Sequence, residues 1–102
     1  KVRKEAIKHL PIIAKLVSRQ FFIRLFSFYQ QKARDNTNWA IRKACVDILL
    51  DFSSLCSAEE REGPLTDSMI NLLRDSNKWV KIAAYKCLGP FLYQLKVLKQ
   101  NS

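Results

Sequence analysis

Few residues in this 102-residue chain have side chains suited to metal binding or nucleophilic chemistry. His9 is the single histidine, and the three cysteines are Cys45, Cys56 and Cys87. No two cysteines form a CxxC pair, and one histidine with three scattered cysteines does not give the spacing of a four-ligand zinc site. We therefore expect reduced, buried thiols that pack as small hydrophobic side chains, with no metal and no other cofactor.

The motifs that enzymes use to cradle phosphate or to activate a nucleophile are also missing from the sequence. It contains neither a glycine-rich phosphate loop nor a GxSxG turn, and His9 has no cysteine or aspartate at a catalytic spacing. The sequence therefore favours a binding protein without catalytic residues over an enzyme.

Charge is the second chemical feature of the chain. Lys and Arg together number 18 and Asp and Glu together number 9, so the formal net charge is +9. The basic excess lies mostly in the first half, where it is suited either to an acidic partner surface or to nucleic acid, or else forms a solvated helix face. No known nucleic-acid-binding signature accompanies it, so we do not expect nucleic acid as the partner.

Targeting signals give a simple expectation. Charged residues occur throughout residues 1–20, and no apolar run approaches the roughly 20 residues of a membrane span. We expect no signal peptide, no membrane partner, and a location in the cytoplasm, the nucleus or both.

An internal repeat with a period of 39 residues organises these side chains. Residues 2–6, 41–45 and 80–84 align, and the apolar register then continues in all three copies. In the first copy the apolar positions are 2, 6, 10, 13 and 17, which are steps of four, four, three and four. Such steps place the apolar side chains on one face of a helix, so the chain contains three copies of one amphipathic helix.

The segments between these copies are also expected to be helical. Residues 21–33 and 65–74 each carry one apolar stripe, and Ser57–Glu60 matches a capping box that opens a short helical turn. We expect Gly63-Pro64 to break that turn, with Pro64 at the start of the next helix. Polar residues 35–38 and 75–77 form the turns that end one helix and cap the next.

The predicted fold is therefore all-α, in the order B, A-B, A-B, with helix pairs joined by tight turns. We expect one unit over 1–102: a B helix in 1–18, a second repeat in 19–56 and a third in 57–100. Pro11 and Pro90 lie inside B helices and are expected to kink them rather than to split them.

This pattern resembles HEAT repeats, which form a superhelix of antiparallel helix pairs (an α-solenoid). The residues that carry the resemblance are Asp35 with Ile41-Arg42 and Ala44, and Asp75 with Val80-Lys81 and Ala84. The strings 38–45, 78–81 and 88–91 further resemble the HEAT-repeat regulatory subunits of protein phosphatase 4, relatives of the phosphatase 2A scaffold. Lys81 departs from the arginine that the family prefers, and the Asp35 turn is one residue longer than the Asp75 turn.

Two sets of residues recur at the turns. A column of alternating charges is expected from Arg3, Asp35, Arg42, Asp75 and Lys81. The column is either a ladder that joins stacked repeats or an anion site on the concave face. The tryptophans Trp39 and Trp79 are expected at equivalent turn positions, each just before a B helix. They either staple each turn onto its own A helix or anchor a partner.

The resemblance implies a non-catalytic scaffold or regulatory subunit that binds a serine/threonine phosphatase catalytic subunit. The expected partner surface is the ridge of turns, which consists of Asn36, Thr37, Asn38, Trp39, Asn77, Lys78 and Trp79. A HEAT scaffold of a transport or nucleic-acid-associated complex is the alternative. Because a stack of repeats exposes core surface at each open end, we also expect marginal stability or self-association.

Overall fold

The computed structural model describes the backbone of residues 4–100 and the side chains of residues 16–98. These residues form helices and no strand, in the order α1 (Lys4–Ala33), α2 (Trp39–Asp47), α3 (Leu49–Leu55), α4 (Ala58–Glu60), the π-helical turn η1 (Arg61–Leu65), α5 (Thr66–Leu73) and α6 (Lys78–Gln100). The expected all-α class is therefore confirmed. None of the helices in the described part is long and apolar enough to cross a membrane.

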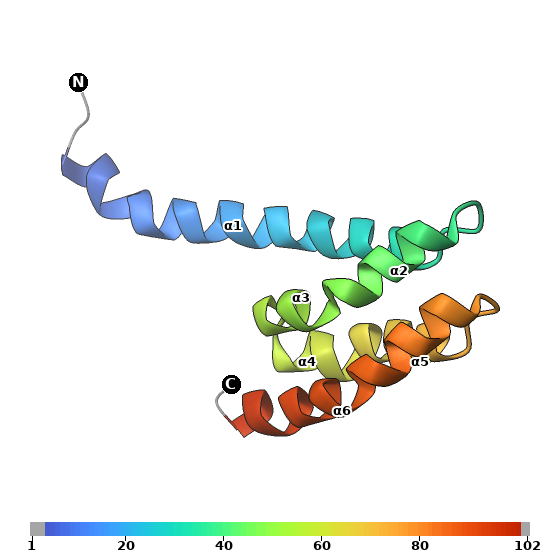
Figure 1. Ribbon diagram of the computed structural model, residues 1–102. Coiled ribbons are helices and arrows are strands. Elements are labelled where there is room, and N and C mark those ends of the chain that lie inside the picture. Colours follow the sequence, from blue (N-terminus) through green and yellow to red (C-terminus); the bar gives the residue numbers. More distant parts are fainter. Residues whose placement is uncertain (1–3, 101–102) are drawn as a thin grey trace.

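The helices form two antiparallel pairs that stack on one another (Figure 1). The first pair is α1 with α2 and α3, and the second is α5 with α6; α6 also packs along α2 and α3. The two connections within the pairs, residues 34–38 and 74–77, lie side by side at one end of the stack (Figure 1). The turns that carry the charged column and the tryptophans are therefore neighbours in space.

The apolar faces that the repeat predicts make up the core. The second copy buries Cys45, Leu49, Phe52 and Cys56, and the third buries Val80, Ala84 and Phe91. The stripes of the intervening segments join them, as Phe26, Tyr29 and Ala33 from α1 and Leu65, Met69 and Leu72 beside α5. Period-39 register and helical periodicity thus predicted the core correctly in the second and third copies.

The three cysteines are free and buried, as expected from their number and spacing. Burial raises the pKa of each thiol, that of Cys56 to about 12, so the thiolate form is disfavoured at neutral pH. In the part of the chain that the structure describes, no three acidic, cysteine or histidine side chains cluster closely enough to hold a metal ion.

The first repeat boundary differs from the prediction. Residues 4–33 form one continuous helix instead of a B helix that ends near residue 18 and a separate A helix from residue 21. The N-terminal part of α1 extends beyond the stack (Figure 1), and Val17 is 60% exposed. The physical reason is local: residues 17–21 contain no glycine, asparagine or proline, the residues that most often end a helix.

The B helices bend at places that proline does not explain fully. The second B helix is interrupted at Ile48, although Ile48 N–H still donates to Ala44 O at 3.1 Å and Phe52 N–H donates to Ile48 O at 2.9 Å. The bonding ladder therefore crosses the interruption, and α2 and α3 form one kinked helix. The third B helix continues through Pro90 without splitting, as expected, while the kink expected at Pro11 lies outside the described side chains.

The segment between the pairs also differs from the prediction in one respect. The Ser57 capping box is present, with Ser57 N–H donating to Glu60 Oε1 at 2.7 Å and Glu60 N–H donating to Ser57 Oγ at 3.2 Å. Gly63-Pro64 does not break the helix, however, because it lies inside the π turn η1 that leads directly into α5. The wider turn accommodates the missing proline N–H, and Thr66 Oγ1 donates to Arg61 O at 2.6 Å.

Candidate functional site

The first turn is held by its own side chains. Asp35 Oδ1 accepts from Thr37 N at 2.8 Å, from Thr37 Oγ1 at 2.7 Å and from Asn38 N at 2.9 Å. Asn38 then caps α2, since its Oδ1 accepts from Ala40 N at 2.9 Å. These bonds fix the backbone of the turn and leave Asn36 exposed at its tip.

The second turn repeats this pattern with one residue fewer. Asp75 Oδ1 accepts from Asn77 N at 2.9 Å. Asn77 Oδ1 in turn accepts from Trp79 N at 2.8 Å and from Val80 N at 3.3 Å, so it satisfies two free amides at the start of α6. Asn38 and Asn77 therefore act as N-terminal caps of α2 and α6.

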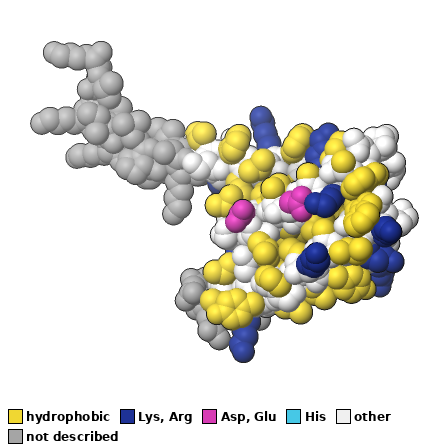
Figure 2. All heavy atoms as spheres, viewed as in Figure 1, with side chains coloured by type: hydrophobic (Ala, Val, Ile, Leu, Met, Phe, Trp, Pro, Cys, Tyr) yellow, Lys and Arg dark blue, Asp and Glu magenta, His cyan; other side chains and the backbone are white. Residues whose placement is uncertain are grey.

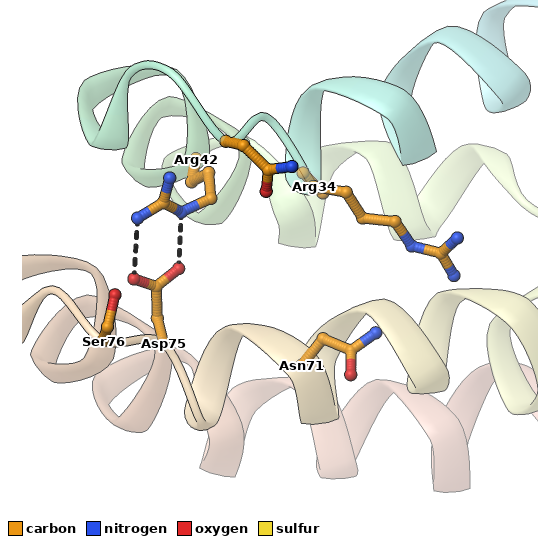
Figure 3. Close-up of a pocket in the computed structure, with 7 residues that line it drawn as sticks. Arg34, Arg42, Asn71, Asp75 and Ser76 are labelled. Atoms are coloured by element: carbon orange, nitrogen blue, oxygen red, sulfur yellow. Dashed lines mark hydrogen bonds and ion pairs between the residues drawn. The ribbon is translucent and has the colours of Figure 1, made fainter.

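Arg42 joins the two turns (Figure 3). Its Nε and Nη2 donate to the two carboxylate oxygens of Asp75 at 2.6 and 2.9 Å, and its Nη1 donates to the backbone carbonyl of Asp35 at 2.6 Å. The side chains of Arg42 and Asp75 are only 15% and 7% exposed. One guanidinium therefore connects α2 to the turns of both helix pairs with a bidentate ion pair.

The rest of the expected charged column is arranged differently. The Asp35 carboxylate bonds to its own turn, and it is the carbonyl of this residue that reaches Arg42. Lys81 is exposed and makes no ion pair among the side chains of residues 16–98, and Arg3 lies outside the described residues. The contacts of Arg42 with Asp75 support a connection between the helix pairs. They argue against an anion site at Arg42, because the Asp75 carboxylate already neutralises its charge.

The ion pair sets an expected dependence of stability on acid. The hydrogen bonds from Arg42 lower the pKa of Asp75 below its ordinary value of 3.8. A carboxyl whose folded pKa is lowered stabilises the fold above its unfolded pKa, and this contribution is lost as pH falls through the folded pKa.

We therefore expect the free energy of unfolding to decrease as the pH is lowered below about 4. In the Asp75→Asn variant it should decrease less steeply. Urea denaturation at a series of acidic pH values measures both slopes. Glu59→Gln, a change to an exposed carboxyl, is the control. Parallel curves for the parent chain and Asp75→Asn would contradict the assignment.

The two tryptophans are not equivalent in the structure. In the 39-residue register Trp39 corresponds to Lys78, and Trp79 corresponds to Ala40, because the first turn is longer by one residue. Trp39 is 41% exposed and Trp79 is 52% exposed, so neither is buried against its own A helix. Each tryptophan is partly covered and partly open, which is compatible with both the staple and the anchor.

Trp79 borders a groove between α2 and α6. The groove has a volume of about 420 Å³ and is also lined by Lys43, Ile82, Lys86 and Cys87. Lys78 Nζ lies 4.9 Å from the centre of the Trp79 ring, which places a cation on the aromatic face. An aromatic side chain, a cation and an apolar floor thus meet at the end of the groove nearest the turns.

Two buried polar contacts were not predicted from the sequence. Arg61, 4% exposed, donates through Nη1 to Ser53 O at 2.9 Å and also to Cys56 O, where α3 ends. Gln94 Nε2 donates to Leu50 O at 3.0 Å across the two B helices. Both contacts hold the helices of the stack together and do not involve the turns. No sequence pattern predicts which distant backbone carbonyl an arginine or a glutamine will bond.

The fold and the turns together define an all-helical stack of two helix pairs in the described part of the chain. No family model matches the chain, and no solved structure matches it either. The chain is similar to serine/threonine-protein phosphatase 4 regulatory subunit 1 from Homo sapiens, Mus musculus and Rattus norvegicus, with 39% identity over 54 residues in each case. The match covers 53% of this chain and 6% of the length of these curated relatives.

Proposed function

We propose that this chain is a HEAT-type helical repeat segment that binds the catalytic subunit of a serine/threonine protein phosphatase of the phosphatase 4 type. The observation that carries the proposal is the 39% identity over 54 residues to proteins named as regulatory subunits of that phosphatase. The period-39 repeat and the stacked helix pairs support a solenoid scaffold. The role is binding rather than catalysis, in the cytoplasm, the nucleus or both.

The ridge of turns is the proposed contact surface. Within it, the caps Asn38 and Asn77 and the Thr37 hydroxyl are occupied by bonds to the turns themselves. Asn36, the two indole rings and the Lys78 ammonium are exposed and are not used in capping the turns. Two aromatic anchors on neighbouring turns of one rigid stack can engage one partner together, which strengthens two individually modest contacts.

Lys78→Glu combined with Asn36→Ala should weaken capture of a purified phosphatase catalytic subunit by at least about tenfold. Neither change removes a helix cap, so circular dichroism should be unaltered; Asn38→Ala would lose the α2 cap and confuse folding with binding. Calorimetric titration of the catalytic subunit into the chain measures the affinity.

The matched control is Lys96→Glu, which makes the same charge change at an exposed position near the other end of α6. Equal affinity of the ridge variant and this control would remove the ridge from the proposal. The face of the B helices that carries Lys43 and Lys86 would then be tested next; Lys4, the third lysine expected there, lies outside the described side chains.

The net charge of +9 favours a second candidate, a HEAT scaffold in a transport or nucleic-acid-associated complex. Arg19 and Arg24 are exposed along α1 and Arg34 is exposed directly after it, so these side chains are available for phosphate contacts. Titration with RNA and DNA over a salt series separates the two candidates. Phosphate binding would weaken steeply and linearly on a logarithmic salt scale, whereas no binding at moderate salt removes this candidate.

A further inference from the structure

The groove between α2 and α6 is mainly apolar inside. The buried side chains of Val46 and Cys87 form its floor, and Leu50, Ile82 and Trp79 lie along its sides. Over α2 and α6 the surface in Figure 2 is mainly hydrophobic, with separate lysine or arginine side chains and few acidic ones. The volume of about 420 Å³ lies within the range of ligand-binding pockets, so the groove can accept apolar side chains of a bound molecule.

The exposed side chains along the groove do not owe their exposure to an open end of the stack. In the 39-residue register Trp79 corresponds to Ala40, and Ile82 corresponds to Lys43. Ala40 is exposed and the Lys43 side chain is 40% exposed, although α6 packs along α2. Positions of this kind therefore stay open to solvent when another helix pair is stacked beside them. The groove is a surface between two helix pairs that are both present.

Lysine side chains surround the groove. Lys86 lines it, is exposed and makes no ion pair with a described side chain, while Lys78 lies over the Trp79 ring at the end nearest the turns. Lys43 on the α2 side pairs with Asp47, but solvent exposure of both side chains makes this pair weak. Asp47 is the single acidic residue among the described residues that line the groove. The groove therefore presents a positive rim around an apolar floor.

Contacts outside the groove hold its two sides in place. Gln94 Nε2 on α6 donates to Leu50 O at 3.0 Å, and Arg42 on α2 pairs with Asp75 in the turn before α6. A groove whose sides are fixed before binding loses little conformational entropy when a ligand fills it. It is therefore suited to a flexible segment that becomes ordered on binding.

We propose that this groove binds an acidic peptide segment of a partner protein. An apolar side chain of the peptide lies on the floor between Ile82 and Leu50, and carboxylates on either side of it lie beside Lys43, Lys78 and Lys86. The lysines select the acidic residues by charge complementarity, and the apolar floor selects the side chain between them.

A peptide fits this surface better than a nucleic acid does. A phosphate backbone needs a continuous row of cations, whereas Asp47 interrupts the lysines and aliphatic side chains form much of the lining. The site also differs from the ridge proposed to contact a phosphatase, because Lys43, Ile82 and Lys86 are not part of that ridge. The proposal therefore does not depend on the phosphatase partner.

Fluorescence anisotropy of a labelled synthetic peptide, titrated with the full chain, tests the proposal. The probe is a short run of glutamates around a central leucine-phenylalanine pair, and it should bind with a Kd below about 100 μM. Replacing the central pair by alanines, or the glutamates by lysines, should weaken binding by at least about tenfold. Absence of binding, or equal binding of the three peptides, would overturn the proposal.

Variants of the groove separate its two components. Ile82→Glu and Lys86→Glu should each weaken binding of the acidic peptide by at least about tenfold, since each adds a negative charge to the groove. Asp47→Asn should instead tighten binding by at least about twofold, because it removes the acid from the rim and releases Lys43. Lys86 and Asp47 are solvated, so these two variants keep the test valid if Ile82→Glu fails to fold.

The matched controls lie outside the groove. Ile70→Glu on α5 repeats the change at a similarly exposed isoleucine, 40% against 43% for Ile82, and Lys96→Glu and Asp67→Asn repeat the two charge changes. All three controls should bind the peptide like the parent chain. Equal effects in the groove variants and their controls would overturn the proposal. Displacement of the peptide by single-stranded RNA at moderate salt would assign the groove to nucleic acid instead.

Discussion

Phe52→Ala should lower the free energy of unfolding by about 3–5 kcal/mol, a large fraction of the total stability of a chain of this size. Phe52 is 6% exposed and stands at the centre of an aromatic cluster that ties α3 to α1. Its ring stacks on Tyr29 with centroids 4.4 Å apart and also contacts Phe22 at 5.7 Å and Phe26 at 5.4 Å. Alanine removes these contacts and leaves a cavity that two helices must close.

Urea denaturation followed by circular dichroism measures the loss. Phe28→Ala is the matched control, because Phe28 is 56% exposed on α1, the helix against which Phe52 packs, with Lys32 over its ring. We expect this control to cost less than about 1 kcal/mol. Similar losses for the two phenylalanines would mean that the α1–α3 contact does not form the core in solution.

The sequence predicted this cluster because burial follows periodicity. Phe52 holds the same register position as Phe91, and Phe22, Phe26 and Tyr29 share one stripe of their helix. A helix that must bury one face gives a regular pattern of apolar residues, which is readable without any structure. The Ser57 capping box was predictable as well, since it depends on residues close in sequence.

Helix ends were harder to predict than helix faces. The repeat suggested a boundary near residue 18, but no residue there stops a helix, and α1 continues through it. Gly63-Pro64 carried a strong stop signal, but the π turn absorbed it. In both places local backbone hydrogen bonding determined whether the helix ended. The spacing of apolar residues does not predict helix ends.

Part of the candidate site was predictable and part was not. Asp75 and Arg42 were expected to meet because they recur at matching turns of stacked repeats. The longer first turn shifts Trp39 by one position relative to Trp79, which rotates it about the helix and breaks their expected equivalence. Arg61 and Gln94 bond to distant backbone carbonyls, and such contacts depend on tertiary placement alone.

Asp75→Ala should destabilise the chain by about 2–4 kcal/mol, because it leaves the Arg42 guanidinium largely buried without its carboxylate. The Asn77 amide loses its acceptor at the same time, so the second turn is loosened as well. A double-mutant cycle with Arg42→Ala isolates the pair itself, and we expect a coupling energy of about 1–3 kcal/mol from urea denaturation.

The exposed pair of Lys43 and Asp47 on α2 provides the comparison that gives this cycle its meaning. Lys43 Nζ lies 3.0 Å from Asp47 Oδ2, but the two side chains are 40% and 54% exposed. Solvent screening should keep the coupling of that pair below about 0.5 kcal/mol. If burial and bidentate geometry make Arg42–Asp75 the link between the two helix pairs, its coupling must exceed that of the exposed pair. Equal couplings would mean that apolar packing of α6 against α2 and α3 alone holds the pairs together.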